Sequence, residues 1–532
     1  MPVMILGLLV GLGPSAGDSP LAGQALIPLA GHREDGIRAG ALRAPGESVT
    51  WSLFRRASTL TPQPEDPGLG IGFLPILPQL QLVWNSDLPF SRNDGALWAA
   101  RGASVLVRAG FRVDKGPLSL ILAPEFTYSQ NRAYQLFASE VEDRSPYSSP
   151  WHEGLHSLDL PSRFGNEPWI WSDFGQSSLT FRFWGTAVGA ATENVWWGPG
   201  LRNSLIFSNQ APGFPHLFLR TEDGVETPAG RFRAHWMVGN LVESLYFDED
   251  EANDLRSLSA FALSFEPAVA PGLSLGVMRS VVAPVEAGGE TFGHALDALL
   301  RWDRRQMPDS DIPVPDSDPL LSAYFRWAFP AGGVEVWGEW ARLDAPASLE
   351  DLLTTPHRTQ AYLVGFQWVR PLGWGSTDFR IQSELTSLEQ ARASSHHPLP
   401  LDFYSGQAAP QGYTHRGQAL GAGIGPGSSS QWIALDLLDP SWRGGIFLER
   451  IRWNNDALYR LPSANLSRHD VSIRLGFRYG LSLPWLELFG EIAGEERYNY
   501  LFQNGYSNPG GFRTIDVRNY TLSLFVIPGG NR

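Results

Sequence analysis

The chain contains no cysteine and only one lysine, Lys115, among its 532 residues. The absence of cysteine excludes thiol catalysis, cysteine-ligated zinc and a disulfide framework. It fits an oxidising envelope compartment, where unpaired thiols are a liability. The cationic residues are therefore almost all arginine, whose planar side chain pairs with carboxylates and stacks on aromatic rings.

Charge of either sign is scarce as well. Charged residues make up 18% of the chain, whereas average proteins have about 25%. The net charge of −14 argues against a nucleic-acid-binding protein. Beyond the N-terminus no uncharged apolar run reaches about 18 residues, which excludes membrane-spanning helices. The hydrophobic content of 43% and the 20 tryptophans provide enough apolar surface for a large folded core.

The N-terminal part of the chain divides into two segments. Residues 1–24 begin with a short apolar stretch followed by small residues, which is typical of a signal peptide and too short to remain as a membrane span. We expect cleavage between Ala16 and Ala25, and export of the mature chain. Residues 25–95 are irregular and punctuated by proline and glycine, so we predict an N-terminal periplasmic or plug segment there. A short helix is possible at 46–58.

From about Leu97 onward, segments of about ten residues alternate between apolar and polar side chains, bounded by turn-forming residues. This pattern predicts an all-β fold for residues 96–532, a transmembrane antiparallel outer-membrane β-barrel of about 18 strands. The clearest predicted strands span 103–113, 178–190, 231–242, 273–282, 320–329, 333–343, 359–369, 377–385, 444–453, 470–480, 484–494 and 518–527.

The two faces of these strands differ in a way that predicts their surroundings. Polar and charged side chains on one face and apolar side chains on the other are typical of barrels with a wet interior and a lipid-facing exterior. A soluble β-sandwich or propeller is the alternative, but no blade repeat of about 40–50 residues is present. In 320–329 the apolar face is Leu321, Ala323, Phe325, Trp327 and Phe329, opposite Ser322, Tyr324 and Arg326; in 470–480 it is Val471, Ile473, Leu475 and Phe477, opposite Ser472, Arg474, Gly476 and Arg478.

Three stretches are candidates for long connections between strands: 247–256, 307–319 and 389–430. A barrel of this size leaves an open lumen unless other parts of the chain occupy it. The N-terminal segment or inward-folded loops could fill it.

The most specific stretch of the sequence lies at 158–221. It contains Glu193-Asn194, Trp196-Trp197-Gly198-Pro199-Gly200, Asn203-Ser204-Leu205 and Ser208-Asn209-Gln210-Ala211-Pro212-Gly213-Phe214-Pro215-His216. This stretch resembles the Wzi family of capsule-assembly outer-membrane proteins, and a glycine-rich element at 413–430 is similar to one near the end of that family.

The resemblance implies an 18-stranded barrel in the outer membrane, with a helical bundle from the N-terminal region at its periplasmic end. It also implies a lectin-like role, in which the protein holds capsular or exported polysaccharide on the cell surface.

The central motif has two possible roles. Its glycines and prolines fix an irregular backbone, and its tryptophans offer large flat surfaces. It could therefore pack into the lumen and brace the barrel, or it could contact polysaccharide. The candidate residues for either role are Asn194, Trp196, Trp197, Arg202, Asn209 and His216.

Charged residues on the predicted inner face form a second candidate set. We expect arginines and carboxylates to pair across the lumen wall, which keeps a wet interior electrically balanced. The predicted charge ladder contains Arg326, Glu335, Glu339, Arg380, Glu384, Arg474 and Glu491, with Arg450 as a further cation.

These carboxylates raise the possibility of a glycosidase. Glu335 and Glu339 share a strand face but lie about 13 Å apart, whereas hydrolysis needs about 5–9.5 Å. Glu487 and Glu491 fail the same test. A cross-strand pair such as Glu335 with Glu384 could still qualify, so a carbohydrate-active enzyme stays as the third hypothesis behind a polysaccharide anchor and a porin-like channel.

Metal and partner predictions follow from the same residues. His396-His397 lacks matching ligands, and the acidic residues at 248–254 and 309–318 lack the spacing of a calcium loop, so we predict no metal, no cofactor and no catalytic residues. The expected partners are capsular or extracellular polysaccharide and outer-membrane lipid, not nucleic acid. We expect a monomer in the outer membrane of a Gram-negative-type cell, with its N-terminus in the periplasm.

Overall fold

The computed structural model describes most of the chain, and the following applies to those residues. The predicted signal peptide lies outside them, as does His396-His397. The described residues are 25–43, 53–60, 70–136, 144–152, 154–285, 291–300, 316–343, 349–354, 359–373, 375–390, 401–460, 467–502 and 515–529.

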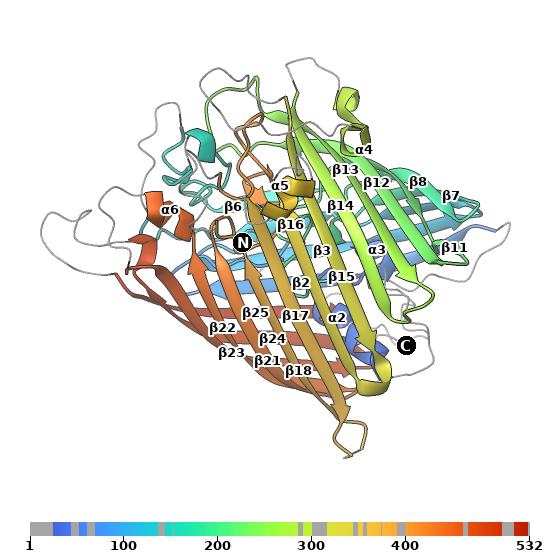
Figure 1. Cartoon of the computed structure of the whole chain (residues 1–532). Coiled ribbons are helices and arrows are strands. Elements are labelled where there is room, and N and C mark those ends of the chain that lie inside the picture. The colour runs from blue at the N-terminus through green and yellow to red at the C-terminus, as the bar shows by residue number, and fades with distance from the viewer. Residues whose placement is uncertain are drawn as a thin grey trace, which may run out of the picture.

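Antiparallel strands form one closed barrel (Figure 1). Its strands are β2 (Gly72–Asn85), β3 (Gly102–Lys115), β4 (Leu118–Leu122), β5 (Glu125–Ser129), β6 (Trp169–Asp173), β7 (Ser178–Phe183), β8 (Thr186–Ala191), β10 (His216–Thr221), β11 (Val225–Thr227), β12 (Gly230–Val242), β13 (Leu255–Pro267), β14 (Leu273–Pro284), β15 (Asp318–Phe329), β16 (Val334–Arg342), β17 (Gln360–Pro371), β18 (Asp378–Ser387), β21 (Ser429–Leu438), β22 (Trp442–Trp453), β23 (Asp470–Leu483), β24 (Leu486–Tyr498) and β25 (Val517–Pro528).

Three strands of the barrel are each divided into two segments. This explains why there are more segments than the predicted number of strands. The segments β4 and β5 both pair with β3, β6 and β7 continue one another beside them, and β10 and β11 both pair with β12. Counted as single strands, they give a barrel of 18 strands. The barrel closes where β25 pairs with β2, with Leu80 opposite Val526. The predicted fold class is confirmed.

Side-chain burial along the strands follows the predicted alternation. In β15 the even-numbered residues from Ser322 to Ala328 are buried, and Phe325, Trp327 and Phe329 are exposed on the outer face. In β23 the side chains of Ser472, Arg474 and Arg478 point inward, on the same face as Gly476, and Ile473, Leu475 and Phe477 point outward. An outer surface of large apolar side chains is the surface that lipid solvates best, because it has no hydrogen bonds to satisfy.

Two sequence predictions about strand limits are wrong. The stretch 178–190 is a hairpin of β7 and β8, not one strand, because Trp184 and Gly185 both have positive φ (46° and 72°). A two-residue turn of this kind reverses the chain without breaking the alternation.

The barrel also begins at β2, so the predicted boundary between residues 95 and 96 falls too late. Proline has no N–H for the strand ladder, and Pro75 and Pro78 made this stretch look irregular. The structure accommodates Pro78 in a register shift between Ile76 and Gln79.

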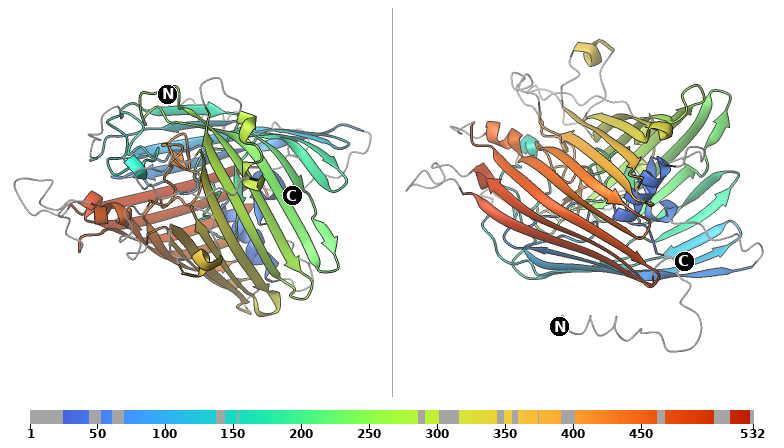
Figure 2. Two further views of the ribbon diagram at one scale, coloured as in Figure 1. Left: turned by 45° about the horizontal axis from the view of Figure 1, so that its top comes forward. Right: turned by 90° about the horizontal axis from the view of Figure 1, so that it is seen from below.

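The residues before β2 run inside the barrel. Helix α2 (His32–Ala41) lies within it, towards the ends of the strands that short turns join (Figures 1 and 2). Strand β1 (Phe54–Arg56) and helix α3 (Ala57–Leu60) follow. The described part of the possible helix at 46–58 therefore contains a strand, because the backbone of β1 pairs with β9 (Val195–Trp197) of the central motif.

Long connections at the opposite end fold into the lumen. Residues 192–215 and 401–428 are almost entirely buried, and their apolar side chains form the main core together with inward residues of β12–β17. Strands β19 (Thr414–His415) and β20 (Gln418–Ala419) form a small hairpin within this filling. Helices α4 (Asp297–Leu300), α5 (Leu349–Thr354) and α6 (Asn455–Arg460) lie near the same end (Figure 1). Among the described residues no helix is long and apolar enough to cross a membrane.

Candidate functional site

The central motif is the middle of the filling. Strand β9 pairs with β1, and the side chains of Trp196 and Trp197 are fully buried. The ring of Trp197 packs edge-on against Phe207, with 5.0 Å between centroids, and at a tilt against Phe54, with 5.8 Å between centroids. Trp196 lies under the guanidinium of Arg55 at 4.9 Å. Both tryptophans therefore brace the lumen filling and are not accessible to a ligand.

The irregular backbone after β9 is held by charged side chains from two directions. Glu384 on β18 accepts hydrogen bonds from the backbone N–H groups of Leu201, Arg202 and Asn203, at 2.6, 3.0 and 2.9 Å. From the N-terminal segment, Arg55 donates to the carbonyl oxygens of Gly198 and Gly200, at 3.0 and 2.9 Å. These bonds satisfy backbone groups that have no partner in a helix or sheet, which is the condition for burying such a loop.

Helix α2 is anchored to the wall by an ion-pair cluster around Glu335. Arg38 donates to Glu335 at 2.6 Å and to the carbonyl of Pro199 at 2.7 Å. Arg326 and Gln367 also donate to the Glu335 carboxylate, at 2.5 and 2.6 Å. Helix, motif and wall thus meet in one buried cluster.

The remaining predicted ladder residues have varied partners. Arg380 pairs with Asp436 and with Asp35 of α2 at 2.9 and 2.7 Å, and Arg474 pairs with Glu449 at 2.9 Å. Glu339 accepts from Ser322 at 2.9 Å. The structure therefore spreads the predicted ladder over several clusters. The prediction is wrong for Arg450, which shares the outer face of β22 with Ile446 and Leu448 and donates to the side-chain oxygen of Gln431 at 2.9 Å.

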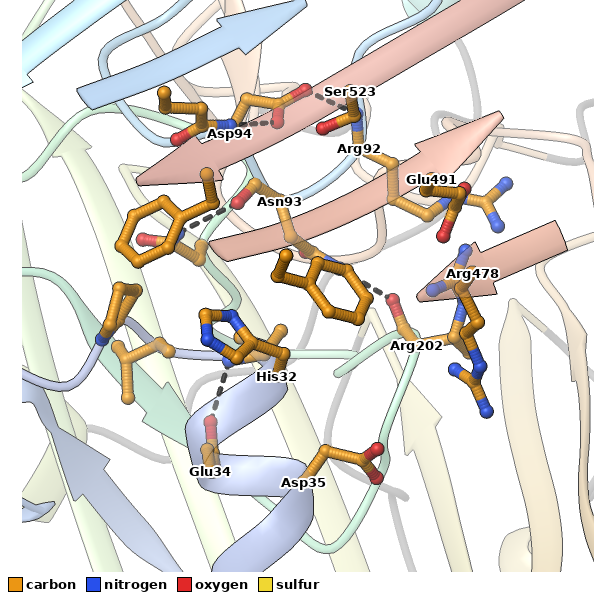
Figure 3. Close-up of a pocket in the computed structure, with 18 of the residues that line it drawn as sticks. His32, Glu34, Asp35, Arg92, Asn93, Asp94, Arg202, Arg478, Glu491 and Ser523 are labelled. Carbon is orange, nitrogen blue, oxygen red and sulfur yellow. Dashed lines mark hydrogen bonds between the residues drawn. The ribbon is translucent and has the colours of Figure 1, made fainter. Parts of the chain in front are cut away.

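Between α2, the loop at 90–95 and the loop at 201–209 lies a cavity of about 200 Å³. Figure 3 shows residues of four origins facing it: His32, Glu34 and Asp35 from α2, the 92–94 turn, Arg202 from the loop at 201–209, and Arg478 and Glu491 from the wall. Seven arginines line it, namely Arg38, Arg55, Arg92, Arg108, Arg202, Arg474 and Arg478.

Aromatic rings hold several of these guanidinium groups in place. Arg202 lies 5.1 Å from the centre of the Trp432 ring, and Arg478 lies 5.3 Å from the same centre. Arg474 sits 3.5 Å from the centre of the Phe90 ring. Such cation–π contacts fix a planar cation without occupying its N–H donors. The cavity is therefore rich in fixed donors.

Acceptor groups face the same space. Asp94 accepts hydrogen bonds from Gln81 at 2.6 Å and from Ser91 at 2.9 Å. Glu491 has no hydrogen bond or ion pair among the described residues, and it lines the cavity wall opposite α2. On the α2 side, burial lowers the pKa of His32 to about 4, although its hydrogen bond with Glu487 opposes this.

We expect Asp94→Asn to stabilise the protein more at pH 7.5 than at pH 4.5. Burial raises the pKa of Asp94 to about 6, against hydrogen bonds from Ser91, the Arg92 backbone and Gln81, and with a further rise from Glu491. Since an unfolded aspartate has a pKa near 4, the folded state loses stability as pH rises from about 4 to 6. The gain from asparagine should be about 2 kcal/mol larger at the higher pH.

Urea unfolding midpoints in detergent at the two pH values measure this difference. The matched control is Asp516→Asn, at the end of the connection that leads into β25. An equal gain at both pH values would show that Asp94 is already ionised in the folded protein at pH 4.5.

The structure divides the six predicted motif residues into two groups. Arg202 and Asn209 line the cavity. Asn194 is buried and bonds to Gln176 and to the carbonyl of Ala211 at 2.8 and 2.7 Å. His216 bonds to the carbonyl of Phe214 at 2.8 Å. With Trp196 and Trp197, these last two residues occupy bracing positions.

Sequence reasoning missed most of the residues that line the cavity. Arg92 and Asp94 lie in a stretch that reads as featureless loop, and Trp432 sits in β21, which was not predicted as a strand. The one available signal was the turn-forming run Ser91-Arg92-Asn93-Asp94-Gly95, in which Asn93 adopts positive φ (57°). Its position opposite residue 202 depends on the fold alone.

Taken together, the molecule is a closed outer-membrane-type β-barrel whose lumen is filled by its own chain around a polar cavity. Comparison with known protein families identifies the particular kind. The family described as "Capsule assembly protein Wzi" matches residues 119–434, more than half of the chain and including both motifs. The chain belongs to this family, as its central motif predicted.

Solved structures give the same fold. The barrel is similar to Wzi of Escherichia coli, described as an outer membrane protein involved in group 1 capsule assembly and a carbohydrate binding β-barrel, with a TM-score of 0.54, 12% identity and 85% of each chain covered. Weaker matches include OccAB3 of Acinetobacter baumannii (TM-score 0.38, 9% identity, 85% of this chain and 98% of that one). OprB of Pseudomonas putida matches with a TM-score of 0.35, 11% identity, and 86% and 94% coverage. A search of curated proteins found no significant match.

Proposed function

We propose that this protein is a non-enzymatic, lectin-like anchor that attaches exported polysaccharide to the cell surface. Membership of the Wzi family supports a place in capsule assembly. The observation that carries the choice between anchor and channel is the filled lumen, in which the central motif, residues 401–428 and helix α2 pack against the inner wall. A lumen filled by the chain's own segments is suited to holding a ligand and not to conducting solutes.

The contacts of the inward carboxylates favour polysaccharide binding over polysaccharide hydrolysis. The two carboxylates that sequence reasoning left as a possible catalytic pair both have structural partners. Glu335 binds Arg38 and Arg326, and Glu384 binds three backbone N–H groups. A general acid or nucleophile has to be free to exchange a proton or attack a sugar carbon.

We also propose the orientation. Helix α2 lies towards the short turns of the barrel, and in outer-membrane barrels the short turns face the periplasm while the longer loops face outward. The N-terminal segment is then periplasmic, and the long connections that enter the lumen come from the cell surface. We expect the barrel to function as a monomer surrounded by lipid.

Deletion of the gene tests the anchor. Total polysaccharide should stay constant while the cell-bound fraction falls and the polymer in the medium rises, because attachment and not synthesis is lost. Expression of the intact chain from a plasmid is the control and should restore the cell-bound fraction. An unchanged partition combined with a fall in solute uptake would contradict the anchor and support a channel. Purified protein in a planar bilayer should show no stable open-channel conductance.

A further inference from the structure

The arginines that line the lumen cavity are not equivalent. Six of the seven form ion pairs with carboxylates: Arg38 with Glu335, Arg55 with Glu34, Arg92 and Arg474 with Glu449, Arg108 with Glu125, and Arg478 with Asp436. Arg202 has no carboxylate partner among the described residues. Its guanidinium is held by the Trp432 ring, and its Nε is buried without a hydrogen bond.

Further donors in the cavity are also unused. The Nη2 atoms of Arg92 and of Arg474 are buried and have no hydrogen-bond partner. Buried donors without partners cost about 1–3 kcal/mol each, and more when charged. A ligand with anionic oxygens would recover this free energy. Burial also lowers the pKa of Arg202, and a bound anion would offset that effect of desolvation.

The cavity offers acceptors beside these donors. The Oδ1 atom of Asn93 is buried without a donor, and the carboxylate of Glu491 is free among the described residues. Sugar hydroxyl groups can donate to such acceptors, whereas fully ionised phosphate or sulfate cannot. The mixture of a free cation and free acceptors therefore suits a polyhydroxylated acid better than an inorganic anion.

The size of the space limits how much of a ligand can enter. A cavity of about 200 Å³ is smaller than the roughly 300–1,000 Å³ of pockets for drug-sized ligands. It can take one sugar residue at a chain end or branch, but not a folded oligosaccharide.

We infer that this cavity binds a single carboxylate-bearing sugar residue, a hexuronate or close analogue, with Arg202 as the carboxylate-binding residue. This inference rests on the proposed function, because it names the class of polysaccharide that the anchor holds. Arg92, Asn93 and Glu491 (Figure 3), together with Arg474, bind the remaining oxygen and hydroxyl groups.

The test uses the full-length barrel, purified in detergent, and isothermal titration with three probes. These are a short oligogalacturonate, a neutral oligosaccharide of the same length, and inorganic phosphate. The intact protein should bind the oligogalacturonate most tightly. Arg202→Gln should weaken that binding at least tenfold and leave any binding of the neutral probe unchanged. Arg202→Lys, which keeps the charge but loses the two-pronged geometry, should lie between them.

Arg518→Gln is the matched control, because Arg518 is mostly exposed and pairs with Glu496 outside the cavity. It should bind like the unmodified chain. Equal affinity of Arg202→Gln and the intact protein for the oligogalacturonate would overturn the inference, as would phosphate binding as tightly as the oligogalacturonate. A change of gel mobility on heating establishes that each variant is folded. If Arg202→Gln does not fold, Arg202→Lys still tests the inference.

The outcomes separate this inference from the proposed function. If deletion of the gene sheds polymer but Arg202→Gln binds uronate normally, the anchor stands and the cavity assignment is wrong. If deletion leaves the polymer on the cell, the anchor itself is wrong, whatever the purified cavity binds.

Discussion

Glu335→Gln is expected to destabilise the folded barrel by about 3–5 kcal/mol, because it leaves two buried arginines without their counter-charge. Glu335 is fully buried and pairs with Arg38 of α2 and with Arg326 of β15. Glutamine keeps the size of the side chain and part of its hydrogen bonding. The decrease in the free energy of unfolding therefore measures the contribution of the negative charge. The same change should loosen α2, because Arg38 joins this helix to both the wall and the central motif.

The measurement is the urea midpoint of unfolding in detergent, followed by tryptophan fluorescence. Glu226→Gln is the control, since Glu226 is exposed and its pair with Arg231 is at the surface; exposed pairs contribute about 0–1 kcal/mol. Proteolysis within residues 25–43 should be faster in Glu335→Gln than in the control. A midpoint shift as small as that of the control would mean that packing, not charge, holds α2 in the lumen.

Trp197→Ala should have the second large effect, a loss of about 3–5 kcal/mol. The ring of Trp197 is fully buried between Phe54, Phe207 and His235, with centroid distances of 5.0–5.8 Å. Alanine removes these contacts and leaves a void at the point where β9 meets β1. Neighbouring side chains are themselves packed on all sides, so they cannot collapse to fill it.

Trp485→Ala is the matched control, because Trp485 lies in the turn between β23 and β24 and its side chain is 65% exposed. Substitutions at such surface positions usually change stability by less than about 0.5 kcal/mol. Comparison of the two variants by the same unfolding assay isolates the contribution of the motif. Equal midpoints would show that the central motif does not stabilise the filling of the lumen. The motif would then again be a candidate for contact with polysaccharide.

The predicted fold class was correct because alternation is a local property. Period-2 patterns in 320–329 and 470–480 place polar side chains inward and apolar side chains outward in β15 and β23. Strands with weaker contrast were missed. In β13 the inward face carries Leu258, Ala260 and Ala262, and the outward face carries Ser257 and Ser259 beside Phe261, so the contrast between a polar inner face and an apolar outer face is lost. The prolines of β2 hid a barrel strand in the same way.

The candidate site could be predicted only in part. The central motif and the inward charges were identified from the sequence, and the motif also predicted the family. Which charges meet was not accessible, since Arg38 and Glu335 lie 297 positions apart in the chain and strand periodicity says nothing about such pairs. For the same reason the sequence could not separate Arg202, which lines the cavity, from Trp196 six residues earlier, which is fully buried.

The sequence by itself determined that the strands form a barrel with a polar inner face and an apolar outer face. The face on which a side chain lies follows from its position in the strand and from its affinity for water or lipid. The sequence also determined the family, because the central motif is contiguous. The tertiary structure alone decided that the lumen is filled by the chain itself and that Arg202, among the arginines lining the cavity, forms no ion pair with a described carboxylate. Both depend on which distant segments share the interior, and that is set by packing a long chain into one enclosed volume.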